Sequence, residues 1–283
     1  MINNICVIGA GTMGSGIALV AAQSSIVTTL FDVKEAMLDK ASAGIQNSLN
    51  FLVEKQKISP QQAIDILNNI HFTSNINHCK ASVIIEAIVE QVAAKVELFN
   101  QLATINTPQS IFASNTSSLS ISDIQLSITN PERVVGMHFF NPAPIMKLVE
   151  VVKGQQTSDV VAQEIYDLCI AMKKTPVLCK DAPGFIVNRV ARHYYLEAMK
   201  LVEQGVASIE EIDAIMEATG FKMGPFKLMD LIGLDINLSV SQSLYNAFEK
   251  AERFRPSPIQ INKVLKGELG KKSGKGFYNY TSV

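Results

Sequence analysis

His138 is well placed in this chain of 283 residues to transfer a proton. It follows the apolar run Val134-Val135-Gly136-Met137, which predicts a buried strand, and it precedes Phe139-Phe140-Asn141-Pro142. Ligands of open α/β sheets bind outside the carboxyl ends of the strands. A histidine at such a strand end can act as a general base, because imidazoles exchange their proton near neutral pH.

Glu150 lies twelve residues further on, inside the apolar run Leu148-Val149-Glu150-Val151-Val152. A carboxylate in an apolar strand is costly to bury unless a partner compensates its charge. An imidazole N–H would be such a partner, and the carboxylate would then fix the tautomer and stabilise the imidazolium. The spacing alone leaves a second interpretation open, in which His138 only caps its strand and Glu150 meets an unrelated Arg or Lys.

Two further polar positions are candidates for substrate contact. Ser117 lies in the polar cluster 114–118 after a predicted strand, and its hydroxyl could donate to a substrate oxygen. Clusters of this kind usually form helix caps or turns, which is the simpler interpretation of these residues alone. Asn188 stands in the first turn of a predicted helix, where its amide faces either a cleft or water.

The N-terminal residues carry a nucleotide-binding pattern. The apolar run Ile5-Cys6-Val7-Ile8 leads into Gly9-Ala10-Gly11-Thr12-Met13-Gly14, which opens an Ala-rich helix, and a second apolar run ends on Asp32. This order of strand, glycine turn, helix and acid is the full dinucleotide-binding fingerprint. We expect Gly9 to permit the tight turn, Gly11 to admit a pyrophosphate, and Gly14 to let helix and strand pack closely.

The same pattern favours NAD over NADP. The helix N-terminus would offer unpaired N–H groups to the phosphates. Asp32 would accept hydrogen bonds from both ribose hydroxyls and would repel a 2′-phosphate. The alternative is a tight turn in a buried α/β unit that binds no ligand.

The secondary-structure elements that position these candidate residues indicate an α/β fold. Apolar runs alternate with helical patterns up to residue 180, which is typical of a mainly parallel, doubly wound Rossmann-type sheet with helices on both faces. A helical stretch over 34–57 and a helix capped by Ser59 and Pro60 predict a helical pair between the second and third strands. The predicted strands are 5–8, 26–31, 71–73, 82–87, 111–114, 134–138, 146–152 and 175–179.

The pattern changes at Lys180-Asp181-Ala182-Pro183-Gly184. Beyond it, residues 185–204, 208–218 and 225–249 predict apolar-rich helices. We therefore expect an NAD-binding domain with its helical insertion at 1–183 and an all-helical second domain at 184–283. The helix predicted at 225–249 is too apolar to face water, so we expect it to be covered by a second copy of the chain in a homodimer. Alternatively, such helices only cover a substrate cleft. The Gly/Lys-rich segment 270–276 predicts a mobile stretch.

Composition excludes several classes of protein. The net charge of −1 and the absence of a basic block argue against nucleic acid as a partner. No apolar stretch approaches the roughly 20 residues that span a bilayer, and Gly9 interrupts the first apolar run, so neither a membrane segment nor a signal peptide is expected. The four cysteines have no metal-like or redox spacing, and they predict reduced thiols in a cytoplasmic protein.

The chain resembles the L-3-hydroxyacyl-CoA dehydrogenase family, especially its bacterial 3-hydroxybutyryl-CoA dehydrogenases. The resemblance extends over the whole chain and combines several motifs, so it is far more specific than the glycine pattern. The matching segments are GAGTMGSG (9–16), ASNTSSLSI (113–121), GMHFFNPAPIMKLVEVV (136–152), KDAPGFIVNRV (180–190), FKMGPFKLMDLIGLD (221–235) and GKKSGKGFYNY (270–280).

The resemblance implies NAD-dependent oxidation of (S)-3-hydroxyacyl-CoA, and the reverse reaction, in fatty-acid or butyrate-type metabolism. It implies a catalytic His138–Glu150 dyad, with Ser117 and Asn188 orienting the substrate. By the same resemblance, Ser48 and Lys55 match CoA-contacting positions of the family. The positions that match the family's NAD site are Asp32, Glu90, Lys95, Asn141 and Lys272, beside the glycine loop.

Two alternatives remain at this stage. Relatives with the same fold and cofactor site could act on another hydroxy acid, such as 3-hydroxyadipyl-CoA, gulonate or carnitine. A non-catalytic, crystallin-like NAD-binding protein is a different class of function. The joint presence of His138, Glu150, Ser117 and Asn188 argues against that class, because a binding-only role needs none of these four together.

Overall fold

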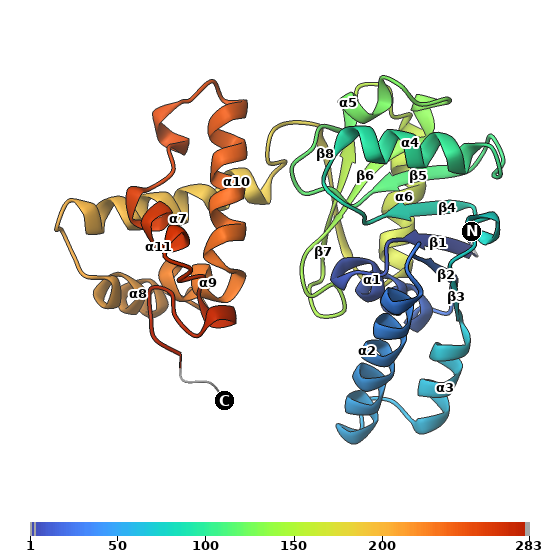
Figure 1. Cartoon of the computed structure of the whole chain (residues 1–283), viewed down its shortest axis with the longest axis horizontal. Helices are drawn as coiled ribbons and strands as arrows, with labels where there is room; N and C mark the ends of the chain where they lie inside the picture. Colours follow the sequence, from blue (N-terminus) through green and yellow to red (C-terminus); the bar gives the residue numbers. More distant parts are fainter. Residues whose placement is uncertain (1, 3, 281–283) are drawn as a thin grey trace. The chain divides into compact units, whose positions relative to one another are not determined.

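The computed structural model of the chain describes Ile2 and residues 4–280. Contacts divide the chain into two compact units, and the boundary falls between Ala182 and Pro183 (Figure 1). Each unit has its own hydrophobic core: one lies around the sheet of the first unit, and the other lies among the helices of the second.

The first unit is built on an eight-stranded sheet with the strand order β3-β2-β1-β4-β5-β6-β7-β8. Strands β1 to β6 are parallel to one another, β7 runs antiparallel to β6, and β8 is parallel to β7. The first six follow the Rossmann order, so the predicted mainly parallel, doubly wound fold is confirmed. The strands are β1 (Asn4–Ile8), β2 (Val27–Phe31), β3 (Ile70–Thr73), β4 (Val83–Glu86), β5 (Ile111–Ser114), β6 (Val134–Phe139), β7 (Leu148–Lys153) and β8 (Thr175–Lys180).

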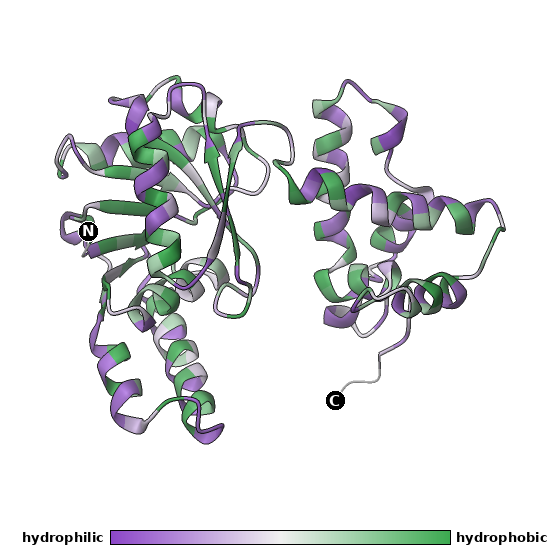
Figure 2. Ribbon diagram, turned by 180° about the vertical axis from the view of Figure 1, so that it is seen from behind, coloured by the Kyte–Doolittle hydropathy of each residue, from purple (hydrophilic) through white to green (hydrophobic). Residues whose placement is uncertain are grey.

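The central strands form where the chain is rich in Val, Ile and Phe. All residues of β4, β5 and β6 are buried, because helices cover the sheet and each strand must be apolar on both faces. Figure 2 shows the hydrophobic residues gathered on these strands and on the helix faces beside them. The helices are α1 (Thr12–Gln23), α2 (Glu35–Glu54), α3 (Pro60–Asn68), α4 (Val92–Ala103), α5 (Ile121–Gln125) and α6 (Asp159–Ala171), with short 3-10 turns at Ile76–His78 and Pro131–Arg133.

Helices α2 and α3 form the predicted pair between β2 and β3, and they extend away from the sheet (Figure 1). The start of α3 follows from its sequence. Ser59 accepts a hydrogen bond from Gln62 N, the Gln62 side chain accepts one from Ser59 N, and Pro60 occupies the first turn.

The second unit is helical. Its helices are α7 (Val187–Glu203), α8 (Ile209–Ala218), α9 (Pro225–Ile232), α10 (Leu234–Ala247) and α11 (Pro258–Leu265), with 3-10 turns at Glu252–Phe254 and Lys271–Ser273. The single helix predicted over 225–249 is wrong: Gly233 has φ 103° and separates α9 from α10.

The segment 270–276 forms a closed turn rather than the mobile stretch that its composition predicts. Gly270 N donates to Lys275 O at 2.8 Å, and buried Asp230 accepts from the backbone N–H groups of Phe277 and Tyr278 at 2.9 Å each. A Cβ on Gly276 would lie 2.0 Å from Asp230 Oδ1, so the glycine is needed for packing.

No helix among residues 4–280 combines the length and the hydropathy that crossing a membrane requires.

Candidate active site

His138 and Glu150 lie opposite each other in the antiparallel pair β6–β7, with His138 Nδ1 2.8 Å from Glu150 Oε2. Residues directly opposite on paired strands project to the same face of a sheet, so the strand register brings the two side chains together. Both side chains are buried, at 7% and 1% exposure. This contact compensates the burial of the carboxylate. The contact is therefore present, and a catalytic role for it remains a prediction.

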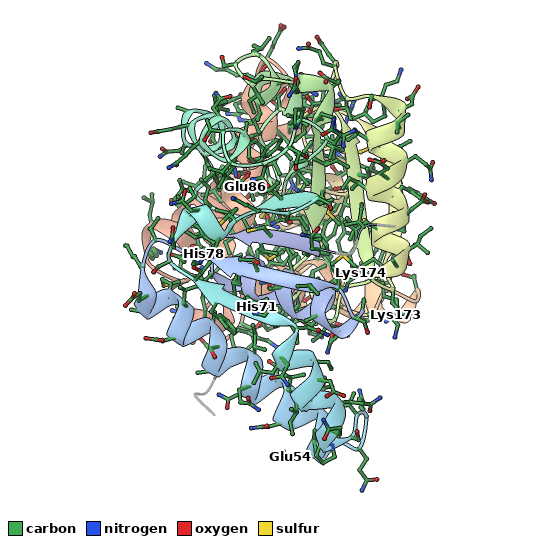
Figure 3. The ribbon with its side chains drawn as sticks, turned by 90° about the vertical axis from the view of Figure 1, so that its right-hand side faces the viewer. Glu54, His71, His78, Glu86, Lys173 and Lys174 are labelled. Atoms are coloured by element: carbon green, nitrogen blue, oxygen red, sulfur yellow. The ribbon has the colours of Figure 1, made fainter. Side chains whose placement is uncertain are left out.

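The other histidines are in different surroundings. His71 and His78 are exposed near the β3 edge of the sheet (Figure 3), and His193 is exposed on α7. His138 is thus the buried one among the four histidines of the chain, all of which the structure describes. Near the pair, burial and the charge of Glu150 raise the pKa of Cys179 to about 12, which keeps this thiol protonated and unreactive.

The glycine loop lies at the carboxyl end of β1, where the strand order reverses between β1 and β4. Gly9 has φ 100°, and its N–H donates to Phe31 O at 2.8 Å. A Cβ on Gly14 would lie 1.7 Å from Gly9 O, so helix and loop can only pack with glycine there. A Cβ on Gly11 would meet nothing within 4 Å. The fold itself does not need glycine at position 11, whereas a pyrophosphate approaching the N-terminus of α1 would.

Asp32 follows the carboxyl end of β2 and is held by backbone groups. Its Oδ2 accepts from Ala10 N at 2.9 Å, and its Oδ1 accepts from Lys34 N at 3.0 Å. These bonds fix the carboxylate beside the glycine loop, where the adenosine ribose of a bound dinucleotide lies in this fold. Thr12 and Met13 form the first turn of α1. These residues therefore fit NAD.

A buried ionic cluster lies at the carboxyl ends of β4 and β5. Glu86, which is fully buried (Figure 3), accepts from Lys95 Nζ at 2.6 Å, from Ser114 Oγ at 2.7 Å and from Ile88 N at 2.7 Å. Lys95 is only 1% exposed, and its ammonium also lies 3.2 Å from Glu90 Oε2. Two of the predicted cofactor-site residues, Glu90 and Lys95, are thus paired with each other.

Glu90 connects this cluster to the Ser117 turn. Its Oε1 accepts from Thr116 Oγ1 at 2.6 Å and from Ser117 N at 3.0 Å. Burial opposes ionisation of Glu90, but the charge of Lys95 and these hydrogen bonds outweigh it and lower the pKa of this carboxyl. Thr116 Oγ1 also accepts from Leu119 N at 2.8 Å, so the polar cluster is a turn as well as a candidate site.

Two residues near the site were not identified from the sequence. Asn115 Oδ1 accepts from Phe139 N at 2.9 Å and so links the end of β5 to β6 beside His138. Glu86 carries the same signal that identified Glu150, a carboxylate in an apolar strand. Applying that rule to every strand would have found it, whereas nothing in the local sequence distinguishes Asn115 from an ordinary turn residue.

The remaining predicted residues lie elsewhere. Asn141 is exposed in the turn after β6, and Ser48 and Lys55 are exposed on and just after α2. Asn188 and Lys272 belong to the second unit, where Asn188 is the second residue of α7. Lys272 Nζ lies 2.8 Å from Asp235 Oδ2.

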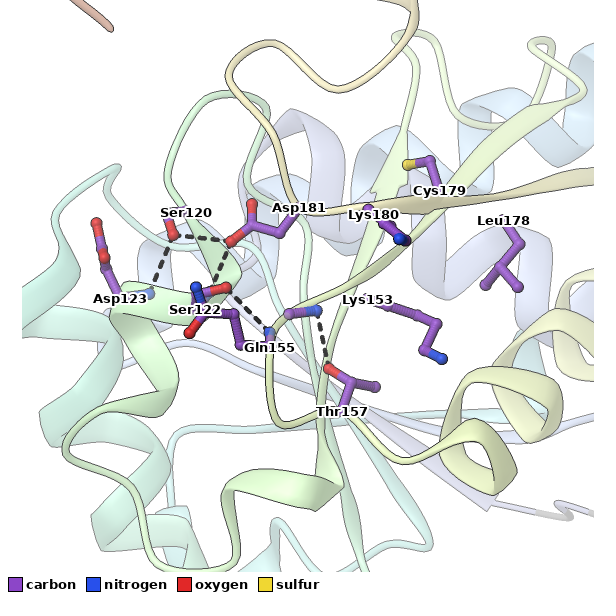
Figure 4. A pocket seen from close by; sticks show the side chains of 11 residues that line it. Ser120, Ser122, Asp123, Lys153, Gln155, Thr157, Leu178, Cys179, Lys180 and Asp181 are labelled. Atoms are coloured by element: carbon purple, nitrogen blue, oxygen red, sulfur yellow. Dashed lines mark hydrogen bonds between the residues drawn. The ribbon is translucent and has the colours of Figure 1, made fainter.

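A pocket of about 660 Å³ opens between the N-terminus of α5 and the ends of β7 and β8 (Figure 4). Its polar groups serve the local structure. Asp181 accepts from Ser120 Oγ and from Ser122 N, at 2.8 Å each, and Ser122 Oγ accepts from Gln155 N at 3.0 Å. None of the predicted site residues lines this pocket, so we do not place the chemistry there.

The doubly wound sheet, the glycine loop at its switch point, the acid after β2 and the histidine–carboxylate pair define a dinucleotide-dependent oxidoreductase. The family model of the 3-hydroxyacyl-CoA dehydrogenase NAD-binding domain matches residues 4–182, and the model of the C-terminal domain matches residues 184–280. The chain belongs to the 3-hydroxyacyl-CoA dehydrogenase family, whose members are NAD-dependent oxidoreductases. The family and the cofactor predicted from the sequence are confirmed.

Individual relatives support this assignment. The chain is 45% identical to a 3-hydroxyadipyl-CoA dehydrogenase of Escherichia coli over 99% of its own length, but it spans only 59% of that relative. It is 41% identical to a probable 3-hydroxybutyryl-CoA dehydrogenase of Bacillus subtilis, over 99% of this chain and 98% of the relative. The crystal structure of an (S)-3-hydroxybutyryl-CoA dehydrogenase from Ralstonia eutropha matches with a TM-score of 0.95 at 36% identity, over all of both chains.

Proposed function

We propose that this protein interconverts (S)-3-hydroxyacyl-CoA and 3-ketoacyl-CoA, with 3-hydroxybutyryl-CoA as its short-chain substrate. The observation that carries the proposal is the buried His138–Glu150 contact at the carboxyl end of β6, in a chain that the family models match along nearly its whole length. Bound NAD supplies the hydride acceptor or donor of this reaction.

His138 is the proposed general base in the oxidative direction. A neutral imidazole that donates its Nδ1–H to Glu150 Oε2 carries its lone pair on Nε2, where it can take the proton of the 3-hydroxyl. In the reductive direction, the protonated ring returns this proton to the 3-keto oxygen. General acid–base help of this kind contributes about 10²–10⁴ in rate.

Glu150 is the proposed orienting and charge-stabilising group. Its carboxylate faces Nδ1, so it fixes which ring nitrogen carries the proton before the reaction. When His138 gains the substrate proton, the carboxylate stabilises the imidazolium. Because the Glu150 side chain is only 1% exposed, water screens this interaction little.

The other site residues are assigned to substrate and cofactor. Ser117 and Asn188 are proposed to hold the reacting oxygen or the thioester carbonyl, as the family resemblance implies. Glu90 and Asn141 are proposed to line the cofactor site, together with Lys272. Lys95 is buried between Glu86 and Glu90, so we propose that it acts on the cofactor site through Glu90.

Ser48 and Lys55 are proposed to bind the CoA handle. Both side chains are exposed, and no ion pair among the described residues includes Lys55, so its ammonium is available to a phosphate. Lys55→Ala should weaken use of acyl-CoA without changing use of NADH. An equal loss with a thioester truncated before the phosphates would argue against this contact.

The proposed domain roles are cofactor binding by residues 1–183 and substrate binding and dimerisation by residues 184–283. Leu231 and Ile236, near the break between α9 and α10, are each 52% exposed, which supports an apolar dimer contact. Light scattering at micromolar concentration should give a homodimer, and Ile236→Glu should shift it toward monomer. A purely monomeric wild type would refute the dimer.

The four unbridged cysteines support a cytoplasmic location.

The acyl chain is tested with a panel of substrates. One relative is named for 3-hydroxyadipyl-CoA and another for 3-hydroxybutyryl-CoA, so both chain types belong in the assay. NADH oxidation should be followed with acetoacetyl-CoA, 3-ketoadipyl-CoA and free acetoacetate. We expect the highest kcat/KM with acetoacetyl-CoA and none with the free acid. A preference for 3-ketoadipyl-CoA would favour 3-hydroxyadipyl-CoA as the substrate instead. Activity with free acetoacetate alone would refute the proposal.

A further inference from the structure

Phe51 is a large apolar side chain on the solvent side of α2, with 54% of its surface exposed. The buried residues of this helix, Leu38, Ala41, Ile45 and Leu49, form a separate stripe that packs on the core. Burial within the described fold therefore does not explain an aromatic residue at position 51. An exposed aromatic ring offers a flat apolar surface on which a planar ligand can stack.

The residues around Phe51 share its face of the helix. Gly44, Ser48, Phe51 and Lys55 recur at intervals of four, three and four residues, which is the spacing of one helical stripe. All four are exposed, and a Cβ on Gly44 would meet nothing within 4 Å. The stripe therefore offers an open shelf at Gly44 and Ser48, next to an aromatic ring and a cation.

Lys55 and Phe51 are already in contact. Lys55 Nζ lies 5.5 Å from the centre of the Phe51 ring, within cation–π range. A helical side chain leans toward the N-terminus, so the lysine reaches back over the preceding turn and brings its charge beside the ring. An aromatic surface and a phosphate-binding cation are thus held together on one exposed helix face.

The hydroxyl of Ser48 adds an acceptor to this face. Ser48 Oγ donates to Gly44 O at 2.9 Å, one turn earlier in the helix. Its proton is therefore used inside the helix, and its lone pairs face outward. The adenine ring of CoA carries an amino group that donates hydrogen bonds, and its ribose carries a 3′-phosphate. An aromatic ring, an acceptor and a cation match these three groups.

We propose that Phe51 is the platform on which the adenine of the acyl-CoA substrate stacks, with Lys55 taking the 3′-phosphate beside it. This inference rests on the proposed function, because it assigns one further binding residue to the CoA handle of that substrate. Stacking of a base on an aromatic side chain is sequence-independent and strong enough to change binding about tenfold. Phe51 then contributes affinity for the nucleotide end of the substrate and does not take part in the chemistry.

The adenine of NAD is a poor candidate for the same ring. Asp32 and the glycine loop lie near the beginning of α2, whereas Phe51 lies sixteen residues after Glu35, about 24 Å further along the helix axis. Figure 3 shows neighbouring Glu54 at the end of α2 that is remote from the sheet. A dinucleotide anchored at Gly11 and Asp32 has its adenosine at the other end of this helix.

The test compares Phe51→Ala and Phe51→Tyr with a matched control, Ile64→Ala. Ile64 is 53% exposed on α3, so it is an equally exposed apolar residue outside the stripe. NADH oxidation is measured with acetoacetyl-CoA, with its analogue lacking the 3′-phosphate, and with acetoacetyl-pantetheine. Lys55→Ala is measured with the same three thioesters, and binding of free CoA is measured by calorimetry.

Phe51→Ala should lower kcat/KM about tenfold with both nucleotide-bearing thioesters and leave acetoacetyl-pantetheine unchanged. Phe51→Tyr should restore the activity, and Ile64→Ala should stay within about twofold of the wild type. Lys55→Ala should cost activity with acetoacetyl-CoA and not with the analogue lacking the 3′-phosphate. These results together would separate the ring from the cation.

An unchanged Phe51→Ala variant would overturn the inference. An equal loss with acetoacetyl-pantetheine would also overturn it, because that substrate has no adenine, and so would a loss confined to the KM for NADH. Failure of the proposed function gives a different result, in which the wild type reduces none of the three thioesters. In that case, calorimetry with free CoA still tests the role of Phe51. Weaker binding by Phe51→Ala than by the wild type would support the stacking role, whereas equal binding by both proteins, or no binding at all, would refute it.

Discussion

Glu150 Oε2 lies 2.8 Å from His138 Nδ1 because β7 turns back against β6 in an otherwise parallel part of the sheet. A parallel neighbour would need a crossover of a dozen or more residues, whereas residues 140–147 are enough for the antiparallel return. The register then places the two residues directly opposite each other. The pairing of imidazole and carboxylate is thus a consequence of strand direction and register.

Replacing Glu150 by Gln should lower kcat by at least about tenfold, because the amide keeps the shape and removes the charge that stabilises the imidazolium. The pH profile of the oxidative reaction should also change, since the ring that takes the substrate proton loses its negative neighbour. Steady-state rates across pH measure both effects. Glu164→Gln, at an exposed glutamate on α6, is the control. An unchanged profile would leave Glu150 with a structural role only.

Gly11→Ala and Gly14→Ala should separate ligand binding from folding. A methyl at position 11 meets no protein atom, so Tm should stay close to that of the wild type while NADH binding weakens at least about tenfold. A methyl at position 14 collides with Gly9 O, so this variant should lose stability itself. Thermal melts and NADH fluorescence titrations measure the two effects. Undiminished NADH binding by Gly11→Ala would contradict the assignment of the loop.

Asp32→Asn should reduce the preference for NADH over NADPH by at least about tenfold. The amide oxygen can still accept from Ala10 N, while the bond from Lys34 N and the negative charge that repels a 2′-phosphate are lost. The ratio of kcat/KM values for the two cofactors is the measurement. A wild type that uses both cofactors equally would show that Asp32 does not have this role.

Glu90 should contribute to the acid sensitivity of the fold. Its pKa is lower in the folded protein than the ordinary value of 4.5, against the cost of burial, because Lys95 and the Thr116 turn favour the ionised form. Such a group stabilises the fold above its unfolded pKa, and this contribution is lost as the pH falls through the lower folded value. Glu90→Gln should therefore flatten the fall of Tm between about pH 5 and pH 3. A fall as steep as in the wild type would exclude this contribution.

Much of the first unit could be predicted because its signals are local. The apolar runs, the glycine loop and the Ser59–Pro60 cap each specify their own element, and the structure contains the strands and helices that they predict. The break at Gly233 was missed, because a single glycine inside an apolar helical pattern is compatible with either a continuous helix or an interruption. The short helices α5 and α11 also carried too little periodicity to be recognised.

Residues of the candidate site could be predicted only where their polarity contrasts with that of their neighbours in the sequence. Glu150 stands out because a charge in an apolar strand needs a partner, and Glu86 obeys the same rule although it was overlooked. The link from Asn115 to Phe139 depends on two strands being neighbours, which no local pattern specifies. Phe51 looks like an ordinary apolar residue of the helix until its exposure is known.

The most direct test of the proposed mechanism is NADH oxidation with acetoacetyl-CoA by the wild type and by His138→Gln. His71→Gln, at an exposed histidine of β3, serves as the matched control. We predict rapid turnover by the wild type and the control, and a loss of about 10²–10⁴ in kcat for His138→Gln with NADH binding retained. Near-normal turnover by His138→Gln would contradict the proposal that His138 transfers the substrate proton.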